Sequence, residues 1–132
     1  MMDFLLEHEY SLPELYEFFS EVFDCSAERI KIYSLDEFSS ATEALDCSGL
    51  DGICVFSSVR GSASQLLQLY RYELRDPALC RRVIDIACRR KMHCYIPTDS
   101  LNGWTYVGDD GMPKRARQIE CDEDDYYLFE LR

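Results

Sequence analysis

The run Gly52-Ile53-Cys54-Val55-Phe56 is the clearest structural signal in this chain. Its apolar side chains follow one another without a polar residue, so a strand here would be buried on both faces. The run therefore predicts a central strand. Residues 66–74 fit either a strand or a helix. We favour a strand that forms a hairpin with residues 53–58, because a turn predicted at residues 60–64 separates the two segments.

Two helix starts precede this strand. Ser11-Leu12-Pro13-Glu14 and Ser34-Leu35-Asp36-Glu37 each place a serine three residues before a glutamate, which is the pattern of a capping box. The first box predicts a helix that runs to about Asp24, and the second predicts a short helix. The apolar positions at helical spacing are Leu15, Phe18, Phe19, Val22 and Phe23 in the first helix and Leu35, Phe38, Ala41 and Leu45 in the second.

A third helix is predicted to start at Asp76 as the N-cap, with Pro77 in the first turn. Arg89-Arg90-Lys91 would close it, where the helix dipole favours cations. Its predicted buried face consists of Leu79, Cys80, Val83, Ile84, Ala87 and Cys88. Further strands are predicted at Arg29–Tyr33, Cys94–Pro97, Trp104–Val107, Arg117–Cys121 and Tyr126–Leu131, with a hairpin turn at Gly108–Gly111.

Length and element order give the fold class. A chain of 132 residues has the size of one domain, and its hydrophobic fraction of 47% is that of a packed globule. Helices and single strands come first and a β-rich part follows, which is typical of an α+β domain. We therefore expect residues 1–132 to form a single α+β domain. About three helices should pack on a mostly antiparallel sheet, with a β-rich C-terminal half.

The charge limits the class of partner. The chain carries 25 acidic residues against 14 lysines and arginines, a net charge of -11. Residues 1–66 hold 13 acids and 3 bases, whereas residues 67–132 hold 12 acids and 11 bases. Nucleic acids and anionic membranes require stripes of lysine and arginine. The charge therefore argues against both as direct partners and favours a basic protein.

The cysteines predict the compartment. There are seven, and none is part of a Cys-x-x-Cys motif. An odd number of free thiols is typical of a reducing compartment rather than of a disulfide framework. Met1-Met2-Asp3-Phe4 lacks the basic start of a signal peptide, and no apolar run approaches the ~18 residues that a membrane-spanning helix needs. We therefore expect a soluble cytoplasmic protein.

The segment Glu120–Asp125 contains five acidic residues just before the last predicted strand. It could be a solvated loop that guards a sheet edge, a calcium site, or a docking surface for a basic protein. A calcium loop needs a glycine at its sharp turn, and this segment has none. Neighbouring aromatic residues favour docking, because tyrosine and tryptophan provide much of the energy at interfaces. The residues predicted to bind the partner are Asp109, Asp110, Asp122, Glu123, Asp124, Asp125, Tyr126, Tyr106 and Trp104.

Other candidate chemistry has simpler explanations. His93 precedes Cys94, but adjacent residues on a strand point to opposite faces, and nothing in the sequence selects a cysteine for His8. The cysteine spacings match no zinc motif, so we predict no metal site and no cofactor. The bases of the third helix lie opposite its apolar face and are expected to form its solvated side. They are Arg81, Arg82, Arg89, Arg90 and Lys91.

A small acidic chain without a catalytic motif and with an acidic and aromatic surface resembles the bacterial immunity proteins of contact-dependent inhibition and polymorphic toxin systems. The residues that carry the resemblance are Asp109, Asp110, Asp122–Asp125, Trp104, Tyr106, Tyr126 and Tyr127. The resemblance implies a tight one-to-one complex with a basic, nuclease-type toxin domain, whose active site or an adjacent surface is covered. It implies no catalytic residues. The free protein is expected to be a monomer or a weak dimer.

Two alternatives remain open. The first is a nucleic-acid mimic or regulatory adaptor that occupies the basic groove of another protein, which would share the same charge pattern. The second is a small thiol-dependent enzyme that uses Cys94 or another thiol with a histidine. Such an enzyme needs a partly exposed cysteine with a lowered pKa.

Overall fold

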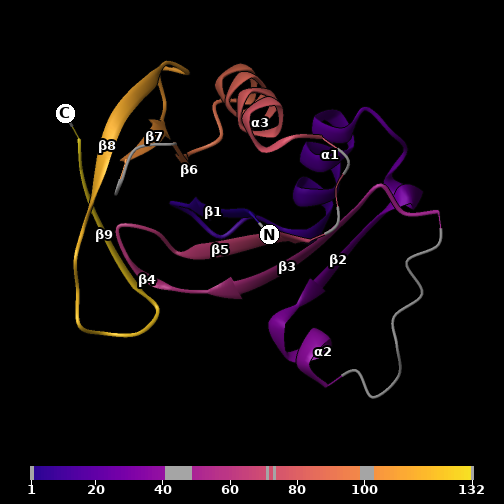
Figure 1. The fold of residues 1–132 in the computed structure, drawn as a ribbon, viewed down its shortest axis with the longest axis horizontal. Helices are drawn as coiled ribbons and strands as arrows, with labels where there is room; N and C mark the ends of the chain where they lie inside the picture. The colour runs from indigo at the N-terminus through magenta and orange to yellow at the C-terminus, as the bar shows by residue number, and fades with distance from the viewer. Residues whose placement is uncertain (1, 41–48, 71, 73, 99–102, 132) are drawn as a thin grey trace.

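Two helices cover one face of a large sheet, and the C-terminal strands stand at one end of it, where the sheet curls round (Figure 1). The computed structural model describes residues 2–40, 49–70, 72, 74–98 and 103–131. The helices are α1 (Leu12–Phe23), the 3-10 helix η1 (Ala27–Arg29), α2 (Leu35–Ser39) and α3 (Asp76–Arg90). The strands are β1 (Met2–Leu6), β2 (Ile30–Ser34), β3 (Gly52–Ser58), β4 (Arg60–Gly61), β5 (Gln65–Tyr70), β6 (Cys94–Pro97), β7 (Gly103–Val107), β8 (Pro113–Ile119) and β9 (Tyr126–Leu131). The predicted α+β class is confirmed.

The nine strands of the described residues form one sheet in the order β2-β3-β5-β1-β6-β7-β8-β9-β4. Neighbours are antiparallel except for two parallel pairs, β2 with β3 and β4 with β9. Strand β3 lies between β2 and β5 and is buried from Gly52 to Val55, which confirms the predicted central strand. The antiparallel pairing of β3 with β5 confirms the strand assignment of the next segment, although this strand ends at Tyr70.

Strand β1 is an element that the sequence patterns did not predict. Leu6 pairs with Gln65 in β5 and with Cys94 in β6, so both partners are distant in sequence. Phe4 and Leu6 belong to the main core, and Leu5 belongs to a second core. Because no local pattern marks a strand whose partners lie so far away, β1 becomes visible only through the fold.

Two sequence predictions are wrong, one for the bounds of a strand and one for a turn. Strand β8 begins at Pro113 and ends at Ile119 rather than spanning residues 117–121. Its pairing with β7 extends back to the pair of Val107 and Pro113, which explains the earlier start. The segment that starts at Arg60, predicted as a turn, begins with the short strand β4, because the main chain there pairs with β9.

Both predicted capping boxes are confirmed, at the starts of α1 and α2. Ala41 and Leu45, predicted for the second helix, lie outside the described residues. Helix α3 starts one residue earlier than predicted, because Arg75 and not Asp76 is its N-cap. The carboxylate of Asp76 instead accepts a hydrogen bond of 2.9 Å from the Tyr72 hydroxyl. In the described ranges, no helix has the length and apolar character that crossing a membrane requires.

The main core lies between the sheet and the helices α1 and α3. Helix α3 buries Ile86, which was not predicted, whereas Cys80, Ile84 and Cys88 are only partly buried. The buried residues of the two helices are Leu15, Phe18, Phe19 and Val22 in α1 and Leu79, Val83, Ile86 and Ala87 in α3.

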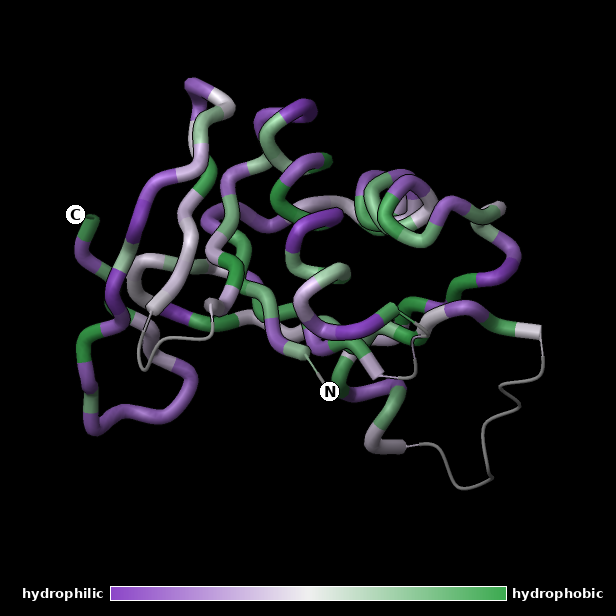
Figure 2. Tube along the Cα trace, turned by 45° about the horizontal axis from the view of Figure 1, so that its top comes forward, coloured by the Kyte–Doolittle hydropathy of each residue, from purple (hydrophilic) through white to green (hydrophobic). Residues whose placement is uncertain are grey.

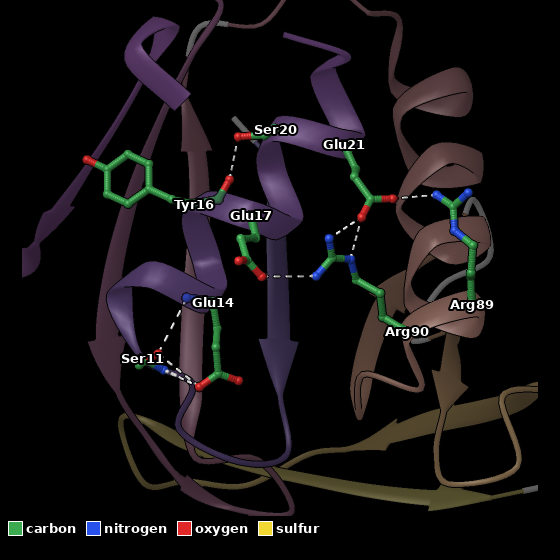
Figure 3. A network of polar contacts seen from close by, with 8 residues as sticks. All are labelled: Ser11, Glu14, Tyr16, Glu17, Ser20, Glu21, Arg89 and Arg90. Atoms are coloured by element: carbon green, nitrogen blue, oxygen red, sulfur yellow. Dashed lines mark hydrogen bonds and ion pairs between the residues drawn. The ribbon is translucent and has the colours of Figure 1, made fainter. Parts of the chain in front are cut away.

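An ion-pair network joins α1 to α3 (Figure 3). The carboxylate of Glu21 receives Arg89 Nη2 at 2.5 Å and the guanidinium of Arg90, and Glu17 lies 3.5 Å from Arg90 Nη1. Arg82 donates to the main-chain carbonyl of Glu21. The bases of α3 are exposed, as predicted, but Arg82, Arg89 and Arg90 are also bonded to α1. Much of the positive charge of the helix is therefore matched within the molecule.

The second core lies where the sheet curls back on itself. Strand β4 follows β3 after Val59 and pairs with β9, so the last strand meets the continuation of an early one. Gly61 is required at this junction. Its φ is +100°, and a Cβ atom there would lie 2.2 Å from the Tyr127 carbonyl oxygen. The buried members of this core are Leu5, Val59, Ala63, Leu66, Tyr95 and Ala116.

Candidate functional site

The loop between β8 and β9, hereafter the acidic loop, consists of Glu120–Asp125. All six residues are exposed, and Figure 2 shows the loop as a hydrophilic stretch at the edge of the molecule. In the part of the chain that the structure describes, its carboxylates form one ion pair, between Glu123 and Arg60 at 3.5 Å. Both side chains of that pair are more than 60% exposed. The acidic loop therefore presents a strongly negative surface to solvent.

The base of the acidic loop is fixed by β4. The Arg60 N–H donates to the Asp125 carbonyl at 2.8 Å, and the Ser62 N–H donates to the Tyr127 carbonyl at 2.7 Å. The Arg60 guanidinium also lies 5.5 Å from the centre of the Tyr126 ring. Asp125 has a φ of 58°, a left-handed conformation that aspartate adopts more readily than most residues. The carboxylates are thus held on a loop whose C-terminal end is anchored.

The predicted aromatic anchors fall into two groups. Trp104 and Tyr106 pack against the second core and bond within the molecule. The Trp104 Nε1–H donates to Gln118 at 3.2 Å, and the Tyr106 hydroxyl donates to Glu7 at 2.6 Å. Burial raises the pKa of Tyr106. Tyr126 is half-buried and belongs to neither core among the described residues, so it is the anchor best placed to act with the acidic loop.

The other predicted acidic residues form the turn between β7 and β8. Lys114 Nζ lies 2.7 Å from the Asp110 carboxylate. This hydrogen bond holds the pKa of Asp110 below its ordinary value. Asp109 Oδ1 lies 2.5 Å from His93 Nε2. Both carboxylates of the turn therefore have a partner within the chain.

The turn and the acidic loop lie at opposite ends of β8 (Figures 1 and 2). This follows from topology, because β7, β8 and β9 are consecutive antiparallel strands. The seven residues of β8 separate the two ends by about 23 Å. Between them β8 exposes Lys114, Arg115 and Arg117. The predicted binding residues thus do not form one continuous acidic patch.

A cluster at the turn end of β8 brings together three residues that the sequence patterns did not connect. Glu7 and His8 follow β1 and His93 precedes β6, and one potential ligand atom from each lies within 4.8 Å of the others. The two imidazole rings are 4.8 Å apart between centroids. The signal for this cluster is the pairing of Leu6 with Cys94, which places the two segments side by side.

The described cysteines are free, and two of them are deeply buried. Burial raises the pKa of Cys54 and Cys94, which keeps both in the thiol form. Cys94 lies in the main core, whereas His93 contacts the carboxylates of Glu7 and Asp109. The adjacent cysteine and histidine therefore do not act on each other.

No protein family, curated protein or solved structure matches this chain. The candidate sites are therefore those that the geometry defines. One is the acidic loop with Tyr126, and the other is the cluster of Glu7, His8 and His93 at the far end of β8.

Proposed function

We propose that this protein binds a basic protein through the acidic loop and Tyr126, and that it serves as a cytoplasmic immunity protein against a nuclease-type toxin. The observation that supports the proposal is the exposed acidic loop, in which five carboxylates have one ion-pair partner in the described ranges. A nuclease domain must be basic around its phosphate site. A loop of this charge would therefore attract such a domain directly.

Long-range attraction and short-range contact have separate roles in this proposal. The carboxylates accelerate the encounter over a distance set by the Debye length, ~8 Å at physiological ionic strength. Tyr126 lies at the end of the loop and offers an aromatic face for contact, with the guanidinium of Arg60 on the ring. An anchored loop also loses less conformational entropy on binding than a free one.

The turn at Asp109 and Asp110 has a smaller part in the proposed interface. Asp109 is bonded to His93 and Asp110 to Lys114. The exposed cations of β8 also separate the turn from the acidic loop. Of these cations, Lys114 is paired with Asp110 and Arg117 with Glu130, so this stretch of β8 offers a basic partner no net attraction toward the turn.

The thiol-dependent alternative receives less support. A catalytic thiol needs a lowered pKa. Four of the described cysteines instead have a raised pKa, and burial is the main cause in each. These cysteines are Cys25, Cys54, Cys88 and Cys94.

A growth-protection assay tests the proposal. Nuclease-type toxin domains, with any encoded directly before this gene taken first, are induced in cells that express the wild-type protein, a loop variant or a control. The loop variant is Asp122→Lys with Asp124→Lys. The control is Glu28→Lys with Asp85→Lys, which makes the same change in net charge at exposed positions on η1 and α3.

We expect the wild-type protein and the control to restore growth and the loop variant to fail. Equal protection by the loop variant would assign binding to another surface. Absence of protection by the wild-type protein would overturn the immunity role itself.

A further inference from the structure

We propose that Glu7, His8 and His93 bind a divalent transition-metal ion of the zinc class. The three side chains supply two imidazole nitrogens and one carboxylate oxygen, a ligand set that zinc accepts in proteins. These are the only two histidines of the chain, and the fold places their rings 4.8 Å apart. The proposal goes beyond the proposed function and does not depend on it.

The orientation of the His93 ring carries the argument. Its Nε2 atom lies 2.5 Å from Asp109 Oδ1. An ionised carboxylate only accepts hydrogen bonds, so Nε2 carries the proton. In the neutral ring, Nδ1 then bears the lone pair. This atom is buried and has no hydrogen-bond partner among the described residues.

The atom that faces this lone pair is another acceptor. His93 Nδ1 lies 3.6 Å from Glu7 Oε1, which is too long for a hydrogen bond. When Nδ1 carries no proton, these two acceptors repel each other, and a metal ion between them would remove that repulsion. Two ligands of one tetrahedral zinc ion are about 3.3 Å apart, given metal–ligand distances of about 2.0–2.1 Å. The spacing of this pair is therefore close to that of two ligands on one zinc ion, and the span of up to 4.8 Å across all three ligand atoms would close by movement of the exposed His8 side chain.

The surroundings match those of a metal site. The Tyr106 hydroxyl donates to Glu7 Oε2 at 2.6 Å and so fixes the carboxylate with its other oxygen toward His93. Asp109 fixes the tautomer of His93 in the manner of a carboxylate–histidine–zinc triad. The main-chain N–H of His93 donates to the Tyr10 hydroxyl at 3.0 Å and so fixes the backbone of His93. Each of the less exposed ligands is thus oriented by a second residue.

The site is open to solvent on one side. The exposed ligand is His8, whereas His93 Nδ1 is buried, so an ion would reach the site from the His8 side. A zinc ion could therefore enter without unfolding the chain, and its fourth position could be taken by water. Bound zinc would join the segment after β1 to the start of β6, so it would stabilise the folded state.

Zinc titration of the full-length protein tests the site. The protein carries Cys121→Ser, because Cys121 is an exposed thiol that could bind zinc independently. Nitrogen-15 NMR of the two imidazole rings should show shifts of His93 Nδ1 and of one His8 nitrogen at one equivalent of Zn2+. His93 Nε2 should keep its proton. Mg2+ should cause no such shift, because it prefers oxygen ligands.

Affinity measurements on variants complete the test. His8→Gln and Glu7→Gln should each weaken zinc binding at least tenfold, and His8 is exposed, so its replacement leaves the core intact. Glu9→Gln is the matched control, since Glu9 bonds to Ser58 and should not affect affinity. Asp109→Asn, at a positioning residue, should weaken binding about tenfold and shift the His93 proton between the ring nitrogens. The proposal would be overturned if the imidazole nitrogen-15 signals did not change on addition of Zn2+, or if His8→Gln and Glu9→Gln had equal zinc affinities.

Discussion

Both ends of β8 carry adjacent aspartates, but their partners differ. At the β7–β8 turn, Asp109 is bonded to His93 and Asp110 to Lys114. In the acidic loop, five carboxylates share one ion pair with Arg60 among the described residues. A net charge of -11 therefore does not describe an evenly acidic surface. The position of each carboxylate relative to a cation decides whether it supports the fold or faces a partner.

The difference follows from where the chain places its bases. Lys114 comes four residues after Asp110, so the hairpin brings the ammonium back to the carboxylate. The nearest cation before the acidic loop, Arg117, is instead paired across the strands with Glu130 at 2.7 Å. The loop is left with Arg60, which comes from β4.

The largest expected effect comes from detaching the acidic loop from β4. Gly61→Ala would place a methyl group 2.2 Å from the Tyr127 carbonyl oxygen, at a φ of +100°. Steric overlap and backbone strain together should lower the free energy of unfolding by about 3 kcal/mol. Denaturant unfolding monitored by tryptophan fluorescence measures this change, because Trp104 packs on the adjacent core.

Gly49→Ala is the matched control for that experiment. Gly49 also has a positive φ, of +74°, but a Cβ there meets nothing within 4 Å. The substitution should therefore cost about 1 kcal/mol from backbone strain alone. Equal losses in the two variants would show that the contact between β4 and β9 is not essential to the fold.

The second prediction separates an interface aromatic from a core aromatic. Tyr126→Ala should weaken binding to the partner by about 2 kcal/mol, as for a central interface residue, with little change in melting temperature. Trp104→Ala should instead lower the melting temperature, because Trp104 packs on the second core. Calorimetry of binding and of unfolding on both variants measures the two effects. A Tyr126 variant that loses stability and keeps its affinity would place this ring in the core.

Local patterns predicted the helices well. The two capping boxes were found from serine and glutamate spacing because all of their atoms come from one turn of helix. The predicted N-cap of α3 was one residue too late. Arg75 and Asp76 both lie just before Pro77, and only the fold shows that the Asp76 carboxylate accepts a hydrogen bond from Tyr72 instead of capping the helix.

Distant contacts could not be predicted in the same way. Strand β1 has partners far along the chain, and β4 meets β9 across more than sixty residues, as the pair of Arg60 and Tyr126 shows. The histidine cluster depends on β1 and was missed with it. The separation of the turn from the acidic loop, in contrast, is implied by consecutive antiparallel strands and could have been inferred from the predicted hairpin.

The third prediction concerns association rates. Asp122→Lys with Asp124→Lys should slow association with a basic partner about tenfold at low salt, because the steering field is lost. Raising the salt should reduce the wild-type rate toward that of the variant. Stopped-flow kinetics measures both, with Glu28→Lys and Asp85→Lys as the control. A wild-type association rate that does not change with salt concentration would mean that the acidic loop is a solvated loop without a role in binding.

The smallest expected effect tests the paired end of β8. The hydrogen bond from Lys114 holds the pKa of Asp110 below its ordinary value of 3.8. The folded state therefore binds this proton more weakly than the unfolded state does. The stabilising contribution is present above the ordinary pKa and is lost as the pH falls through the lowered value. It should be small, because the carboxylate is exposed to solvent.

Lys114→Gln should raise the pKa of Asp110 toward 3.8, as measured by the pH dependence of its carboxyl carbon signal in NMR. Arg115→Gln is the matched control, because it removes a neighbouring exposed cation of the same strand that takes no part in the Lys114–Asp110 ion pair. Asp110→Asn should lower stability slightly at pH 7 and not at pH 2, where the wild-type carboxyl is increasingly protonated. If both lysine and arginine replacements moved the pKa equally, the turn would respond to the general field of β8. The contrast between a paired turn and an unpaired acidic loop would then reduce to a difference in local charge density.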